Sequence, residues 1–96
     1  MNVQLEVFCE GATAAQLEAA VQAAAGVFAA ADVDPMVAWC ALGALEDWDD
    51  MGFPEDWAMS AREKRAVEVF GDAQAAASDV LNCPPGKPAM LDFREV

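Results

Sequence analysis

The sequence contains no histidine and no tyrosine. Histidine is the commonest general base near neutral pH and the commonest protein ligand of metal ions, and tyrosine is a further acid–base group. Without these side chains most enzyme classes become improbable. We therefore expect a protein that is not an enzyme and that uses no metal ion or other cofactor.

Basic residues are also scarce. The 96 residues include 5 Lys and Arg against 17 Asp and Glu, so the net charge is -12. Residues 1–61 hold 11 acidic residues and no Lys or Arg at all. DNA, RNA and anionic membranes are bound through basic surfaces that neutralise their phosphates. We therefore expect no direct binding to nucleic acid and no binding to a membrane.

Cysteines are few, and long apolar runs are absent. Cys9, Cys40 and Cys83 form no Cys-x-x-Cys pair, and an odd number of widely spaced cysteines is a poor disulfide framework. We expect them to be small, buried apolar groups. The purest apolar stretch, residues 35–45, is far shorter than the ~20 residues of a membrane-spanning helix, and residues 1–6 lack the basic region of a signal peptide. These features predict a soluble, cytoplasmic protein.

What the chain does have is enough apolar material for one core. Hydrophobic residues make up 56% of the sequence and charged residues 23%, which is far from the composition of disordered chains. A chain of this length closes one hydrophobic core and has no material for a second. We therefore expect a single domain over residues 1–96.

Local patterns predict three helices between two short strands. Residues 3–7 and 91–96 alternate apolar and polar side chains as strands do, and we expect these two strands to pair, in a direction that the pattern leaves open. Capping boxes at Thr13/Gln16 and Ser60/Glu63, and a helix-starting proline at position 35, predict helices over about 13–31, 35–51 and 60–81. The fold class is α+β, mostly helical, with an all-α fold as the alternative.

The second predicted helix begins with apolar residues on every face, which is typical of a central, buried helix. Trp39 and Trp48 are assigned to the core of the domain on the same reasoning, because a small helical domain needs large side chains to fill its interior.

The end of this second helix violates a local rule. Six of the acidic residues of the first 61 fall within eleven positions: Glu46, Asp47, Asp49, Asp50, Glu55 and Asp56. Anions in the last turn of a helix are disfavoured by the helix dipole by about 0.3–1 kcal/mol each when exposed. Such violations without a local gain mark candidate functional sites. We name residues 46–57 the acidic segment and take its carboxylates as candidate partner-binding groups.

Two aromatic residues of the acidic segment, Phe53 and Trp57, are further candidates for partner binding, because an exposed aromatic ring surrounded by charge resembles a binding hot spot. The sequence leaves a plainer interpretation open. In that interpretation the acids serve only as a solvated surface, or Arg62, Lys64 and Arg65 fold back against them.

In its size, its acidity, its lack of histidine and its lack of any catalytic constellation, the chain resembles the small inhibitor proteins of phages and mobile elements, particularly the anti-CRISPR proteins. The resemblance covers the whole chain as a profile, and the acidic segment is its most relevant part. It implies a non-catalytic inhibitor whose carboxylates occupy a basic groove where nucleic acid would sit. The implied partner is a basic nucleic-acid-binding protein or ribonucleoprotein complex, in the host cytoplasm if a phage encodes the protein.

Two alternatives remain at this point. An immunity protein or antitoxin that acts against a nuclease would have the same profile. A structural or adaptor domain that self-associates through apolar surface, with an alanine-rich helix as the seam of a homodimer, would account for the high apolar share of so short a chain.

Overall fold

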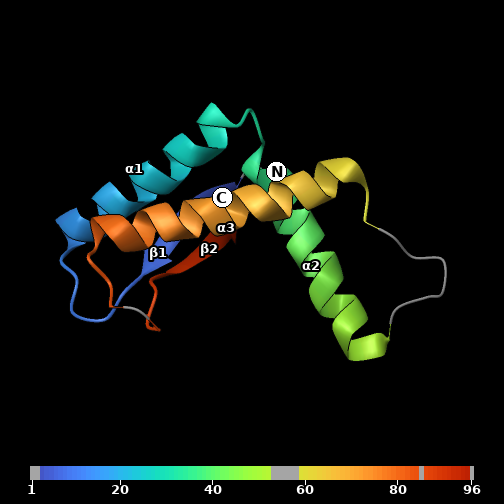
Figure 1. Ribbon diagram of the computed structural model, residues 1–96. Coiled ribbons are helices and arrows are strands. Elements are labelled where there is room, and N and C mark those ends of the chain that lie inside the picture. The colour runs from blue at the N-terminus through green and yellow to red at the C-terminus, as the bar shows by residue number, and fades with distance from the viewer. Residues whose placement is uncertain (1–2, 53–58, 85, 96) are drawn as a thin grey trace.

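The structure, a computed structural model, describes residues 3–52, 59–84 and 86–95, and for residues 47–51 it describes the backbone alone. The element order is β1 (Val3–Phe8), α1 (Ala14–Ala30), α2 (Pro35–Met51), α3 (Ala61–Val80) and β2 (Met90–Glu95) (Figure 1). The predicted fold class, α+β and mostly helical with paired terminal strands, is confirmed, and each predicted boundary lies within about a residue of the observed one.

The two strands form an antiparallel pair, which settles the direction that the sequence left open. Val3 lies opposite Glu95, and Phe8 lies opposite Met90. A two-stranded sheet is marginal by itself, so it depends on packing one face against the helices. On that inner face Phe93 of β2 stacks on Phe70 of α3, with ring centroids 5.4 Å apart.

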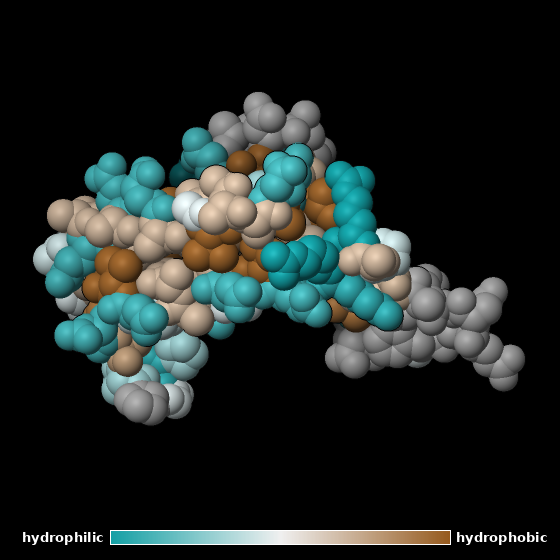
Figure 2. All heavy atoms as spheres, turned by 45° about the horizontal axis from the view of Figure 1, so that its top comes forward, coloured by the Kyte–Doolittle hydropathy of each residue, from teal (hydrophilic) through white to brown (hydrophobic). Residues whose placement is uncertain are grey.

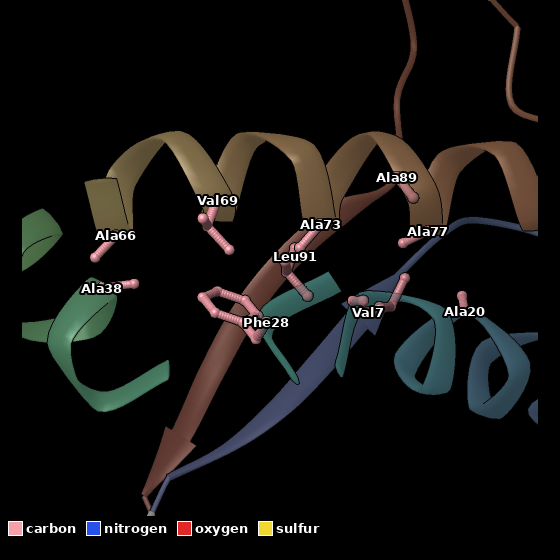
Figure 3. Packing of buried hydrophobic residues seen from close by; sticks show 11 residues of the cluster. Val7, Ala20, Phe28, Ala38, Ala66, Val69, Ala73, Ala77, Ala89 and Leu91 are labelled. Carbon is pink, nitrogen blue, oxygen red and sulfur yellow. The ribbon is translucent and has the colours of Figure 1, made fainter. Parts of the chain in front are cut away.

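Helices α1 and α3 run antiparallel across this sheet and enclose the main core (Figures 1 and 3). Eight of the twelve buried apolar residues that the structure describes are alanines, and the largest side chains that are fully buried belong to Phe28 and Val69. In Figure 3 the ring of Phe28 points toward Val69 within one buried cluster. Short alanine side chains let the helices approach closely, so Phe28 supplies much of the core volume.

Helix α2 is not the central helix that the sequence predicted. It packs its first half on α3 and then projects away from the sheet and α1 (Figure 1). Ala38 and Ala41 are buried in it, whereas Cys40 is exposed and Trp39 is only half-buried. Apolar residues on every face show only that a helix lacks a polar side. Which elements cover the helix depends on long-range packing, and in this fold α1 and α3 cover each other.

The projection of α2 makes the molecule elongated. Its principal extents are 44 × 27 × 24 Å, and its radius of gyration of 14.2 Å exceeds the ~12.5 Å expected for a compact domain of this length.

The helix starts follow the predicted local chemistry. The Thr13 hydroxyl accepts a hydrogen bond from the backbone N–H of Gln16 at 3.2 Å, and the Gln16 side chain accepts one from the N–H of Thr13 at 2.8 Å. Ser60 and Glu63 repeat this box with distances of 3.2 and 3.1 Å. Both boxes satisfy backbone donors that have no partner inside the helix. Gly52, with a φ of +86°, ends α2 as predicted.

Helices α1 and α3 end in the same motif. The residue after each cap has a left-handed backbone, Asp32 with a φ of 55° and Asn82 with a φ of 59°. After α3 the N–H of Cys83 donates to the carbonyl of Ser78 at 3.0 Å, and the corresponding bond follows α1. This is a Schellman motif, which satisfies carbonyl groups at the helix end and fixes the direction of the following chain.

Over the described ranges, no single helix is long and apolar enough to cross a membrane. Helix α1 and residues 35–46 of α2 satisfy a test of length and composition only as a pair, and the two are bent by 97° at the break between them.

Candidate functional site

The acidic segment begins within α2. The backbone of Glu46, Asp47, Asp49 and Asp50 lies in the last turns of this helix. The Glu46 side chain is exposed. The side chains of Asp47, Trp48, Asp49 and Asp50 are not among those described, and Phe53, Glu55, Asp56 and Trp57 lie outside the described residues. The structure therefore positions four of the six acids by their backbone.

Helical geometry gathers these acids. Positions 46, 49 and 50 are related by three and four residues, so they share one face of α2, and Asp47 lies one turn from Asp50. No basic residue lies in the last turn of α2 to offset them. The negative end of the helix dipole, equivalent to about half an elementary charge, lies at the same place. The end of α2 is therefore a concentrated negative pole.

This negative pole lies at the end of α2 that projects from the body. In Figure 1 the light-green end of α2 is at the tip of the projecting arm, on the side of the molecule away from the sheet. A surface carried on a projecting helix can enter a concave partner.

The bases that the sequence set against these acids lie at the start of α3. Arg62, Lys64 and Arg65 are all exposed, and Arg65 lies 3.8 Å from Glu68 of its own helix. Exposed ion pairs of this kind contribute little to stability. The acids toward which these bases were expected to fold lie mostly outside the described side chains, so this interpretation stays a prediction.

A pocket that the sequence did not indicate lies between the end of α1 and the start of α3. Its volume is about 470 Å³, and charges of both signs line it: Asp32, Asp34, Arg62 and Arg65. Because these charges are balanced and Asp32, Asp34, Arg62 and Arg65 are all exposed, the pocket does not select an ion by charge. Among the described side chains, no three Cys, Asp or Glu groups converge in a way that could hold a metal ion.

The cysteines differ from the prediction. Cys40 is exposed, and Cys9 and Cys83 are half-buried, so none of them is a fully buried apolar group. Although 74 positions separate Cys9 from Cys83, their Sγ atoms lie 3.8 Å apart. The hydrogen bond with the Cys83 thiol, aided by partial desolvation, raises the pKa of Cys9 above the ordinary value of a cysteine. Local sequence patterns carry no signal for this pair, because the fold alone brings it together.

Comparison with protein-family models, with curated proteins and with solved structures finds no match for this chain. The functional argument therefore rests on the charge distribution and the geometry of the chain itself.

Proposed function

We propose that this protein is a non-catalytic inhibitor that docks the acidic end of α2 on the basic nucleic-acid-binding surface of another protein or ribonucleoprotein complex and blocks access of the nucleic acid. It would act in the manner of the anti-CRISPR proteins, in the cytoplasm of the host cell if a phage encodes it. One observation supports this most: the carboxylate-bearing turns of α2 stand at the tip of a projecting helix (Figure 1).

The charge distribution supports the same proposal. The absence of Lys and Arg from residues 1–61 leaves no positive charge of α1 or α2 to weaken the negative pole. Complementary potentials speed the diffusional encounter of two proteins and disfavour partners of the same sign. A groove that normally holds phosphates carries the matching positive charge, and carboxylates on a helix of ~10 Å diameter can occupy it.

The segment beyond Gly52 has a separate role in this proposal. Phe53 and Trp57, together with Met51, would supply apolar contact at close range after the charges have brought the two proteins together. A target of this kind would be an RNA-guided interference complex or a restriction nuclease. A toxin nuclease is a target of the same chemistry, and in that case the protein would be its immunity protein or antitoxin.

The test compares two variants with equal charge. In the first, Glu46→Gln, Asp47→Asn, Asp49→Asn and Asp50→Asn neutralise the end of α2. In the control, Glu18→Gln, Asp72→Asn, Asp79→Asn and Glu95→Gln neutralise exposed acids of the body. Both variants change the net charge from -12 to -8.

The binding assay uses targets captured from a bacterial lysate at low salt and then purified. We expect the α2 variant to bind at least tenfold more weakly, the body variant to bind nearly as well as the wild type, and short duplex DNA or RNA to compete. Equally weakened binding by both variants would show that only total charge matters, and wild-type binding by the α2 variant would show that these acids do not carry the interaction. The absence of nucleic-acid competition would rule out the proposed mode of inhibition.

The self-associating domain remains a second candidate because of one observation. Phe8 and Met90 face each other across the outer side of the sheet, with exposed fractions of 53% and 63%. Figure 2 also shows a band of apolar residues between polar ones on one face of the molecule. Light scattering distinguishes the candidates: a dimer that persists in high salt and is lost in Phe8→Ser favours self-association, and a monomer favours the inhibitor.

A further inference from the structure

Cys9 and Cys83 belong to two segments whose backbones are separately fixed. Cys9 follows β1 directly, and its carbonyl accepts a hydrogen bond from the N–H of Ala12 at 3.3 Å. Cys83 is the last residue of the Schellman motif at the end of α3, where its own N–H donates to the carbonyl of Ser78. The distance of 3.8 Å between the two sulfur atoms is therefore a consequence of the fold.

A small oxidant can reach this pair. The two cysteines line an open pocket of about 490 Å³ formed by the end of β1, the segment that follows α3 and the start of β2. Lys87 and Glu10 also line it, so its wall is polar as well as apolar. The raised pKa of Cys9 is the opposite of what an activated nucleophile requires, which favours a structural role for the pair over a catalytic one.

We infer that Cys9 and Cys83 form an intramolecular disulfide when the protein meets a small disulfide oxidant such as oxidised glutathione. The thiolate of one cysteine attacks the oxidant, which forms a mixed disulfide and releases one glutathione thiol. The second cysteine then attacks the sulfur of the first and releases the second glutathione. The protein loses two electrons and two protons, and the oxidant is reduced to two thiols.

Little movement is needed for this step. The sulfur atoms must close from 3.8 Å to the ~2.05 Å of a disulfide, a change within reach of side-chain rotation and a small shift of the loops. Cys40 lies on α2, away from this pocket, and is not part of the pair.

The bond would tie the end of β1 to the exit of α3 and would close a loop of most of the chain. In the chain-entropy treatment, a loop of this length raises the folding equilibrium constant on the order of a thousandfold. The disulfide therefore matters more for stability than its surface position suggests.

The test uses the full chain carrying Cys40→Ser, which leaves only this pair. After equilibration with oxidised glutathione in native buffer, we expect alkylation and mass spectrometry to show the loss of both thiols in a monomer two mass units lighter. The urea midpoint should rise and should return when dithiothreitol is added. Two controls, Cys9→Ala and Cys83→Ala in the same background, should retain glutathione or a free thiol and show no such rise.

Three results would overturn the inference: two free thiols that persist in the oxidised buffer, stable glutathione adducts on both cysteines, or a disulfide between two chains. If the control variants unfold, the oxidised and reduced forms of Cys40→Ser still give a comparison without any change at the pair.

Discussion

Phe28 is the core residue whose truncation we expect to destabilise the protein most. It is 1% exposed and is, with Val69, one of the two largest fully buried side chains that the structure describes. Its neighbours in the buried cluster are mostly alanines, which have no rotamers and cannot move to fill a space. Replacing Phe28 with alanine should therefore leave a cavity that relaxes little.

The expected cost follows from this packing. Replacing a buried phenylalanine with alanine lowers the free energy of unfolding by about 3–5 kcal/mol. Sites that cannot collapse around the cavity lie in the upper part of that range. The total free energy of unfolding of a 96-residue domain is about 5–14 kcal/mol. We expect Phe28→Ala to lower the free energy of unfolding by about 4 kcal/mol. If the total free energy of unfolding lies at the low end of its range, the variant would be largely unfolded at elevated temperature.

Urea denaturation followed by circular dichroism measures this change. With a slope of about 1.5 kcal/mol/M, the midpoint should fall by about 2.7 M. The matched control is Phe8→Ala, which removes the same ring from a side chain that is 53% exposed and should cost under about 1 kcal/mol.

A fall of less than about 1 kcal/mol in Phe28→Ala would show that the alanine-rich interface of α1 and α3 does not depend on this ring. An equal loss in Phe8→Ala that shrinks on dilution, because the wild-type dimer then dissociates, would show that a second copy of the chain covers Phe8, and would favour the self-associating domain.

Three further predictions concern the helix ends. Asn82→Gly and Asp32→Gly relieve a side chain in the left-handed region, and each should raise the free energy of unfolding by about 0.5–1 kcal/mol, measured as a higher melting temperature. Hydrogen bonds from Ser60 lower the pKa of Glu63, so the capping box contributes stability above the usual glutamate pKa and loses it as the pH falls through the lowered pKa. Glu63→Gln should therefore flatten this part of the profile of stability against pH. An unchanged profile would contradict the assignment. Asp49→Asn with Asp50→Asn should raise stability by about 0.5–2 kcal/mol, most strongly at low salt, while weakening target binding.

The features that the sequence predicted well are those decided within a few residues. Thr13 with Gln16 and Ser60 with Glu63 start their helices through bonds that span three positions, and Gly52 supplies a backbone conformation that side chains rarely adopt. Such interactions do not depend on the rest of the fold.

The features that the sequence missed depend on contacts between distant segments. The apolar faces of α2 did not indicate that α1 and α3 would pack on each other. Because they do, α2 is only partly covered and Trp39 is half-buried. The approach of Cys9 to Cys83 depends jointly on the pairing of β1 with β2 and on the motif that ends α3. For the candidate site, the acids of α2 stay a prediction from the sequence, and the projecting arm that carries them was not predicted.

That arm connects the stability cost with the proposed function. Helix α2 ends with like charges beside the negative end of its own dipole, an arrangement that basic residues would stabilise. Solubility alone would not require these charges at the end of α2, because acids anywhere on the surface of the body would serve it equally well. In the proposed inhibitor, carboxylates at the tip of a projecting helix would raise the negative potential where the partner is met first, so the loss of stability and the gain in encounter rate would come from the same residues. A variant that is more stable but binds less well would therefore link both properties to these carboxylates.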